Sequence, residues 1–320
     1  MSSAAATTTA TRLSGIAAML GSGLSNQTGA AIGALAFPVL GPVGVVAVRQ
    51  YVAAALLLAV GRPRFRTFTR RQWWPVLLLA VVFATMNLSL YSAVDRIGLG
   101  LAVTLEFCGP LAIALASSRR RADVGCAVLA VAGVAALMRP RPTTDYLGIG
   151  LGLLAAACWA SYILLNRTVG RRIPGTQGAA AAAGVSGLLF LPVGVVLAVR
   201  HPPTLGAVGC AVAAGVLSSA VPMLADLFTL RRVPARLFGL FMSVNPVLAA
   251  VVGGVVLGQA PDAVEWASIG AIVLANALSL LTAPRTPRAP APAPTPPEGR
   301  VPGREPYPAG PGGPCGGRAG

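Results

Sequence analysis

Long apolar runs separated by short polar segments extend along most of the chain. A helix needs roughly 20 mainly apolar residues to cross the hydrocarbon of a bilayer. The first run is the weakest, because five polar side chains interrupt it between residues 22 and 28. The pattern predicts ten transmembrane helices, over residues 13–36, 42–60, 73–94, 97–118, 122–138, 146–166, 176–199, 205–230, 236–258 and 263–282.

Composition favours a membrane protein over a soluble one. Of the 320 residues, 55% are hydrophobic and 11% are charged, whereas soluble domains carry about a quarter charged residues. The net charge of +16 would suggest a nucleic-acid partner in a soluble chain. Here the basic residues are arginines, apart from His201, and they stand between apolar runs. We therefore exclude nucleic acid and predict a multi-pass protein of the cytoplasmic (inner) membrane.

Arginine placement predicts the orientation of the helices, because cytoplasmic loops hold an excess of positive charge. If both termini are cytoplasmic, 20 of the 25 basic residues lie inside, and only Arg49 lies within a span. Four then lie outside: Arg96, Arg139, Arg141 and Arg200. The inner loops include one group on residues 62–71, with Arg62, Arg64, Arg66, Arg70 and Arg71, and another with Arg167, Arg171 and Arg172.

The two ends of the chain differ in composition from the spans. Residues 1–12 are expected to be a short cytoplasmic segment. Arg12 and the run Ala34-Leu35-Ala36 also resemble a signal peptide with its cleavage site, although the first apolar run is too long and too polar for one. Residues 283–320 are rich in Pro, Gly and Arg and are expected to form a disordered cytoplasmic tail. The five cysteines show no zinc-ligand spacing, so neither a metal nor another cofactor is predicted.

An internal repeat divides the spans into two halves. A shift of 136 positions places Gly109-Pro110-Leu111 on Asn245-Pro246-Val247. The halves, residues 13–138 and 146–282, each hold five spans, so the second is inverted relative to the first. Pro110 and Pro246 are expected to break equivalent helices at membrane depth, where a free carbonyl is tolerated if it lines a cavity. The alternative is that each proline merely produces a kink that improves packing.

Two carboxylates lie within the predicted spans. Glu106 lies near the middle of the fourth span, and Asp226 lies in the eighth, about one turn from Arg231. A charge at the bilayer centre costs at least about 2.5 kcal/mol, so such residues are functional candidates. Glu106 could exchange protons, or form a structural ion pair with Arg49. Arg49 could bind a substrate carboxylate or extend toward the interface, and Asp226 could simply reach water or pair with Arg231.

Other polar and aromatic residues within the spans are candidates for substrate contact. A mid-helix amide in lipid needs a hydrogen-bond partner, which favours Asn87 and Asn245. Tyr and Trp often serve only as anchors at the membrane interface. The remaining candidates are Asn26, Tyr91, Trp159 and Tyr162. No catalytic motif accompanies them, and the chain is not predicted to be an enzyme.

Several segments resemble the EamA branch of the drug/metabolite transporter superfamily. They are Asn87–Ala93, Gly100–Ala112, Ser218–Pro222, Arg236–Gly239 and Met242–Ala250, of which Leu-Glu-Phe-x-Gly-Pro at 105–110 is the most specific. Within this branch, residues 13–282 are most similar to the inner-membrane threonine and homoserine exporters. Glu106 and Arg49 match charged residues of those exporters, and Asp226 stands where they usually carry Glu. Asn245 departs from them, because they carry an acidic residue before this proline.

The resemblance implies an all-α carrier with ten helices in a 5+5 inverted repeat. We predict export of a small threonine- or homoserine-like amino acid, or a related polar metabolite, coupled to protons and proceeding by alternating access. Pro110, Pro246 and Pro222 would be the breaks that allow gating. The alternatives are a broad-specificity drug or metabolite exporter, and a structural or lipid-handling membrane protein without a transport cycle. The expected partners are a small-molecule substrate, protons, membrane lipid and a second copy of the chain.

Overall fold

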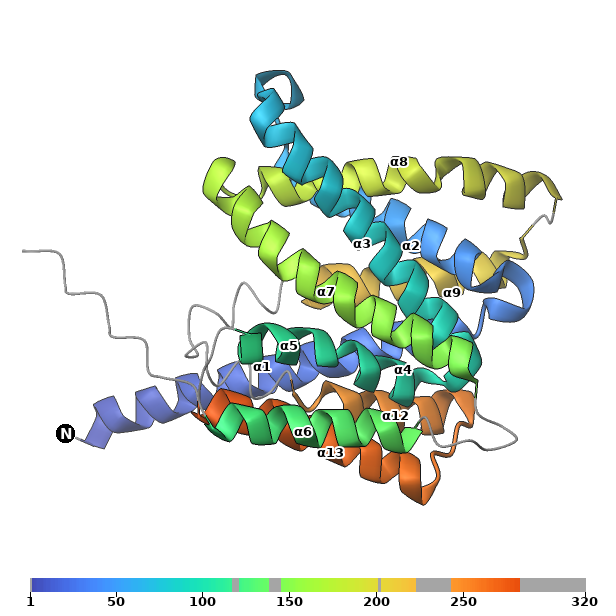
Figure 1. Ribbon diagram of the computed structural model, residues 1–320. Coiled ribbons are helices and arrows are strands. Elements are labelled where there is room, and N and C mark those ends of the chain that lie inside the picture. Colours follow the sequence, from blue (N-terminus) through green and yellow to red (C-terminus); the bar gives the residue numbers. More distant parts are fainter. Residues whose placement is uncertain (1, 117–120, 138–144, 201–202, 223–242, 283–320) are drawn as a thin grey trace, which may run out of the picture. The chain divides into compact units, whose positions relative to one another are not determined.

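A computed structural model describes residues 2–116, 121–137, 145–200, 203–222 and 243–282. Within these ranges every regular element is a helix. All described residues belong to one compact unit, and residues 284–320 lie outside the described ranges. Elements of this unit fall on all ten predicted spans (Figure 1).

Within residues 2–116 the described helices follow one another with short connections, and further helices lie in the other described ranges. In chain order they are α1 (Ser2–Ala34), α2 (Phe37–Gly61), the 3-10 turn η1 (Phe65–Thr67), α3 (Arg70–Ile97), α4 (Leu99–Glu106), α5 (Cys108–Ala116), α6 (Arg121–Leu137), α7 (Tyr146–Arg172), α8 (Gln177–Arg200), α9 (Leu205–Gly215), the π-helical turn η2 (Val216–Ala220), α12 (Asn245–Leu257) and α13 (Ala263–Thr282).

Helix boundaries follow local chemistry. Thr69 and Gln72 form a capping box at the start of α3. Gly41 has a φ of 63°, which bends α2 just before Pro42, so the regular part of this helix starts where the apolar pattern predicted. Gly98, with a φ of 83°, turns the chain sharply between α3 and α4. α1 begins at Ser2, so it extends well before the predicted start at residue 13.

Four described helices are long and apolar enough to cross a membrane: α2, α3, α7 and residues Gln177–Leu197 of α8. Five further apolar segments of the described residues are shorter: Leu99–Ile113, Val124–Ala136, Leu205–Ser219, Asn245–Leu257 and Ala263–Ser279. Large apolar side chains remain exposed on these helices, among them Leu188, Val199 and Val255 at 66%, 78% and 83%. This outward apolar surface suits a protein whose solvent is lipid.

Helices that are distant in sequence form the main packing pairs. α3 packs on α7, α2 on α8, α6 on α13, and α12 on both α1 and α4 (Figure 1). Glycines allow several of these approaches. A Cβ at Gly100 would lie 2.8 Å from Ala250 Cα of α12, and a Cβ at Gly152 of α7 would lie 2.8 Å from Leu105 Cδ1. These positions therefore require very small residues.

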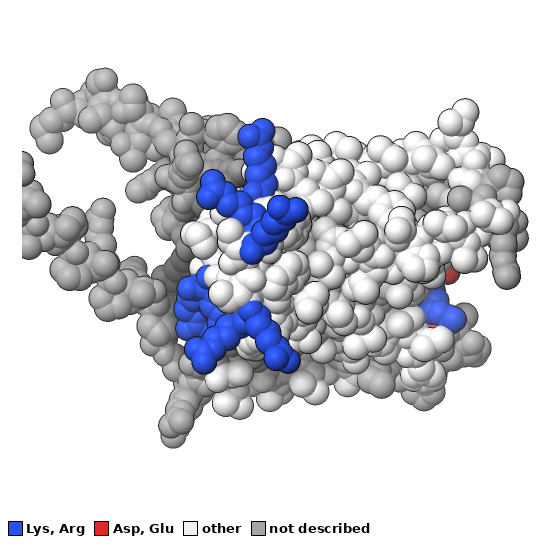
Figure 2. Space-filling model, turned by 90° about the horizontal axis from the view of Figure 1, so that it is seen from above, with Lys and Arg blue, Asp and Glu red and all other residues white. Residues whose placement is uncertain are grey.

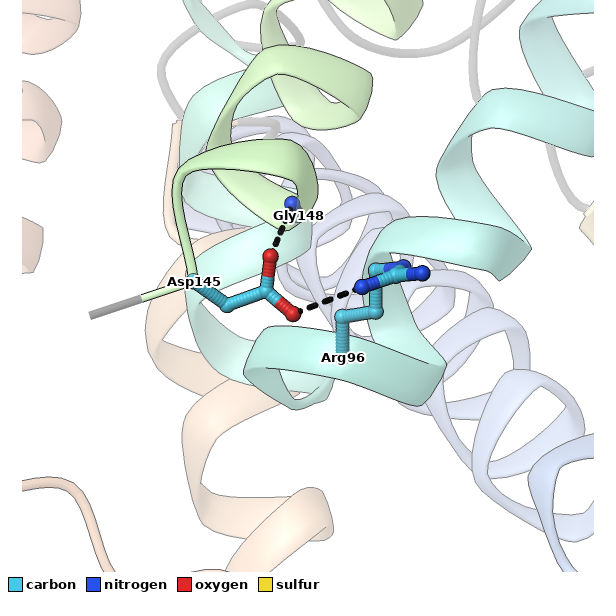
Figure 3. A network of polar contacts seen from close by, with 3 residues as sticks. All are labelled: Arg96, Asp145 and Gly148. Carbon is cyan, nitrogen blue, oxygen red and sulfur yellow. Dashed lines mark hydrogen bonds and ion pairs between the residues drawn. The ribbon is translucent and has the colours of Figure 1, made fainter. Parts of the chain in front are cut away.

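One ion pair ties the end of α3 to the start of α7. Arg96 Nη1 donates to Asp145 Oδ2 at 2.9 Å, and Asp145 Oδ1 accepts from the Gly148 N–H at 2.8 Å (Figure 3). Asp145 is thus the N-cap of α7. The hydrogen bond from the Gly148 N–H, and after it the one from Arg96, hold the pKa of Asp145 below its ordinary value.

Candidate functional site

A polar cavity of about 330 Å³ lies among α1, α2, α3, α4, α7, α12 and η2. This volume is at the small end of the range for small-molecule sites. Eight residues singled out in the sequence line it: Asn26, Arg49, Asn87, Glu106, Trp159, Tyr162, Pro222 and Asn245. The fold therefore brings most of the candidates together, although more than 200 residues separate the first from the last.

Glu106 is the acidic residue that lines the cavity. It is the last residue of α4, and 8% of its surface is exposed. The helix is interrupted at Phe107, and α5 begins at Cys108. Pro110, in the first turn of α5, has no N–H to donate to the Glu106 carbonyl in the usual helical bond. The carboxylate therefore sits at a helix break beside the cavity.

Arg49 provides the positive charge from α2. Its guanidinium carbon lies 5.1 Å from the centroid of the Tyr91 ring, a cation–π contact. Tyr91 is almost fully buried and does not line the cavity. Its hydroxyl has no hydrogen-bond partner in the described part of the chain. The Tyr91 ring therefore contacts the Arg49 guanidinium without itself lining the cavity.

Arg49 and Glu106 do not form an ion pair with each other. Among the described residues the ion pair of Arg96 with Asp145 is the only one. Both residues nevertheless line the same cavity. The guanidinium of Arg49 and the carboxyl group of Glu106 are therefore not paired with each other there.

Amide side chains occupy the wall between α1, α3 and α12. Gln27 Nε2 donates to Asn245 Oδ1 at 3.3 Å, which links α1 to the first residue of α12. Asn87 Nδ2 donates to the Phe83 carbonyl one turn earlier in α3, at 2.8 Å. The side-chain oxygen of Asn87 is left as an acceptor in the wall.

Aromatic rings form an apolar part of the wall. Trp159 meets Phe107 edge to face, with ring centroids 4.7 Å apart and an interplanar angle of 87°. Tyr162 and Phe83 lie 5.9 Å apart, centroid to centroid. Both pairs join α7 to the first part of the chain. Trp159 and Tyr162 are therefore held by packing at this depth and are not only anchors at the membrane interface.

The sequence analysis missed Ser22, Gln27 and Ser218, which also line the cavity. The signal for the first two was present, because they belong to the polar run that made the first span the weakest. Ser218 lies in η2, where its Oγ donates to the Asn26 carbonyl at 3.0 Å. π-Helical turns are often found at functional sites, but nothing in the local sequence predicts one here.

The remaining candidates lie away from the cavity or outside the described residues. Pro110 does not line the cavity, and Pro246 lies in the first turn of α12, where a missing N–H is tolerated. Asp226 falls in residues 223–242 and cannot be placed.

The far end of α4 is closed against α12. Gln259 Oε1 accepts the Leu99 N–H at 2.8 Å, just after the turn at Gly98. The close approach of Gly100 to Ala250 lies between this bond and the cavity.

In the described ranges, apolar helices surround a small polar cavity lined by an arginine, a glutamate and several amides, an arrangement typical of a membrane carrier for a small molecule. Groups of three or more potential metal ligands are absent from the described ranges. The model of the EamA-like transporter family matches residues 146–281.

Curated relatives extend this match to most of the chain. The chain is 36% identical over 261 residues to the threonine/homoserine exporter RhtA of Escherichia coli (strain K12), covering 81% of this chain and 88% of the relative. RhtA of Salmonella typhimurium (strain SL1344) is 36% identical over 267 residues, covering 82% and 90%. A solved crystal structure aligns over 87% of this chain and 99% of its own, with a TM-score of 0.53 and 22% identity, which shows a shared fold.

The chain belongs to the EamA-like transporter family. It is a multi-pass exporter of the cytoplasmic (inner) membrane that carries a small molecule, and it is not an enzyme. The alternative of a membrane protein without a transport cycle is thereby set aside.

Proposed function

We propose that this protein exports a small zwitterionic amino acid of the threonine or homoserine type, or a related polar metabolite. The observation that carries the proposal is the pairing of Arg49 and Glu106 on one small cavity without an ion pair between them. A guanidinium can bind a carboxylate through two parallel hydrogen bonds, and a carboxylate can hold an ammonium group. The amides near Gln27 and Asn245 would then contact the polar side chain of the substrate.

Proton coupling follows if Glu106 binds either a proton or the substrate ammonium. Protonation removes the charge that holds the ammonium group, so the proton and the substrate compete for one site. Proton entry from outside would then favour substrate release there. Arg49 would hold the substrate carboxylate throughout, through the paired hydrogen bonds that a guanidinium forms with it.

A 5+5 inverted repeat, with halves at residues 13–138 and 146–282, is supported by the pattern of helix packing. The spans run α1, α2, α3, α4–α5, α6 in one half and α7, α8, α9–η2, α12, α13 in the other. If each span is replaced by its equivalent in the other half, the packing of α3 on α7 becomes that of α9 on α1. In the same way, α1 on α12 becomes α7 on α4, and α2 on α9 becomes α8 on α3. All six of these packing pairs occur in the structure. The pairs α2·α8, α4·α12 and α6·α13 join equivalent spans directly. Such self-matching packing is expected around a two-fold axis in the membrane plane.

Alternating access would use the packed end of α4 as one gate. On the orientation predicted from the arginines, the Leu99–Gln259 bond would lie on the outer side and would help to hold α4 against α12 when the carrier is closed to the outside. Opening would separate α4 from α12 next to the breaks marked by Pro110 and Pro246. Pro222, which lines the cavity after η2, would be a third flexible point.

A broad-specificity drug or metabolite exporter is the second candidate. It is favoured by Asn245, which removes a charge that the resembling exporters carry before this proline. An uncharged amide discriminates less between ligands of different charge than a carboxylate does.

Transport by purified protein in liposomes tests the proposal. We expect a proton gradient to drive threonine or homoserine movement by the wild-type protein and not by Glu106→Gln. Asp95→Asn is the matched control, because Asp95 is exposed at the far end of α3. Unchanged proton-driven transport by Glu106→Gln would exclude the proton role. Equal transport of uncharged drugs and amino acids by the wild-type protein would favour the second candidate.

A further inference from the structure

The ends of the four helices long enough to cross a membrane meet at one end of the described unit. α2 ends at Gly61 and α7 at Arg172, while α3 begins at Arg70 and α8 at Gln177. These residues mark the level at which the spans leave the hydrocarbon. Side chains around them are therefore expected to lie among lipid headgroups.

Hydrogen bonds join residues 62–72 to residues 167–177 in one surface. Gln72 Nε2 donates to the Arg172 carbonyl at 2.8 Å, and Arg172 Nη1 donates to the Arg71 carbonyl at 2.8 Å. The Arg64 N–H also donates to Gln177 Oε1, at 3.3 Å. Two segments about 100 residues apart in sequence are thus held together. We call this surface the arginine face.

The arginine face is strongly and uniformly positive. It carries five exposed arginines between residues 62 and 71 and three more at 167, 171 and 172. The chain contains no acidic residue from 1 to 94 or from 146 to 225. None of these eight side chains forms an ion pair within the described ranges. Figure 2 shows the basic residues gathered at one end, whereas the basic group at the opposite end lies beside acidic atoms.

Aromatic rings accompany the charges. Trp74 is 50% exposed, and the Arg172 guanidinium carbon lies 5.1 Å from the centroid of its ring. Phe65, also exposed, stacks on Trp73 with an interplanar angle of 16°. Exposed Trp and Phe rings favour the boundary between headgroups and acyl chains. The combination of rings and guanidinium groups suits a lipid better than a soluble anion.

Some of the positive charges on the arginine face are not offset by a helix dipole or by a nearby acidic residue. Arg171 and Arg172 lie in the last turn of α7, where the helix dipole stabilises positive charge. Arg70 and Arg71 lie in the first turn of α3, where the dipole opposes it, and this turn holds no acidic residue. Anions supplied from outside the chain would offset both the dipole and the mutual repulsion of the arginines.

We infer that the arginine face binds the phosphate groups of anionic phospholipids. Basic clusters at the end of a membrane span attract anionic headgroups, with each basic side chain contributing a factor of about five in binding. Trp74 and Phe65 would lie against the acyl chains of the same lipids. This inference concerns a surface distinct from the cavity and does not depend on the identity of the exported substrate.

Lipid titration of the purified protein tests the inference. The full chain in uncharged maltoside micelles is titrated with phosphatidylglycerol, phosphatidylcholine or inorganic phosphate, and bound molecules are counted by native mass spectrometry. The variants are Arg70→Gln alone and Arg66→Gln with Arg70→Gln and Arg171→Gln, chosen because these side chains make no hydrogen bond or ion pair in the described ranges. Arg96→Gln is the control that removes one charge from the opposite end.

We expect phosphatidylglycerol to bind the wild-type protein and Arg96→Gln more tightly than phosphatidylcholine does. Binding should weaken about fivefold in Arg70→Gln and about a hundredfold in the triple variant. Equal affinity for the two lipids, or an unchanged triple variant, would overturn the inference. Saturable binding of inorganic phosphate without a preference for phosphatidylglycerol would overturn it in favour of a soluble anion. The single variant keeps the test valid if the triple variant does not fold.

Discussion

Gln50 Nε2 donates a hydrogen bond to Ser186 Oγ at 2.9 Å, and 136 residues separate the two. The same offset places Gly109-Pro110-Leu111 on Asn245-Pro246-Val247. Residues at equivalent positions of two halves related by a two-fold axis can touch only near that axis. Both side chains are buried, at 1% and 0% exposure. If the proposed repeat is correct, its two-fold axis therefore passes close to the contact between α2 and α8.

We predict that Gln50 and Ser186 are energetically coupled. Gln50→Leu leaves the Ser186 hydroxyl without its donor, and Ser186→Ala leaves the Gln50 amide without its acceptor. Each change should destabilise the protein by about 0.5–2 kcal/mol. The double variant should lose less than the sum of the two, as measured by thermal unfolding in detergent. Strictly additive losses would show that the bond contributes nothing.

We predict that Arg49→Lys weakens substrate binding more than it weakens folding. Lysine keeps the positive charge but cannot form the two parallel hydrogen bonds of a guanidinium with a carboxylate. Loss of one charge-assisted hydrogen bond of about 1.5–3 kcal/mol corresponds to a KM roughly ten- to hundredfold higher. Transport kinetics in liposomes measure this effect, with Arg96→Lys as the matched control. Equal KM values for Arg49→Lys and the wild type would remove Arg49 from the binding site.

We predict opposite outcomes for two substitutions of Tyr91. Tyr91→Phe retains the ring under Arg49 and removes a buried hydroxyl that has no partner in the described residues, so affinity and stability should be kept or slightly improved. Tyr91→Leu removes the cation–π contact, which contributes about 0.5–2 kcal/mol, and frees the guanidinium. Substrate affinity, measured by a thermal-shift titration, should fall up to about thirtyfold. Identical affinities for the two variants would contradict a positioning role for the ring.

We predict that the stabilisation from Asp145 is lost at acid pH. Its pKa is lowered in the folded state, so the contribution to stability is complete above the ordinary carboxyl pKa of about 3.9. It disappears as the pH falls through the lowered pKa. Asp145→Asn keeps a cap oxygen for Gly148 but cannot protonate or pair with Arg96. The Tm advantage of the wild type over this variant should therefore shrink between about pH 6 and pH 2, and a constant difference would contradict the linkage.

Much of the helix layout could be predicted from the apolar pattern alone. α7 begins at Tyr146 and α13 spans Ala263–Thr282, as expected from the sequence. The starts of α1 and α2 were less predictable, because α1 continues through a polar N-terminal segment and Gly41 bends α2. Apolar periodicity does not report such local backbone choices.

The cavity was predictable in part. Charged and amide side chains such as Arg49, Glu106 and Asn245 were recognised as candidates because placing them in hydrocarbon costs free energy. Tyr91 was a candidate for substrate contact but does not line the cavity, because the sequence does not say which face of α3 a residue occupies relative to Arg49. Ser218 was missed as an individual wall residue because its orientation depends on the π-helical turn η2.

The polar run of α1 has a consequence for how the protein is made. Gln27 bonds to Asn245, Ser25 Oγ donates to the Leu217 carbonyl, and the Asn26 carbonyl accepts from Ser218. The partners of the first helix are therefore synthesised about 200 residues after it. Until the ribosome has delivered residues 217 and 218, and Asn245 after them, these groups of α1 lack these partners in the protein. Chains that stop before Asn245 should consequently be prime substrates for membrane quality-control proteases.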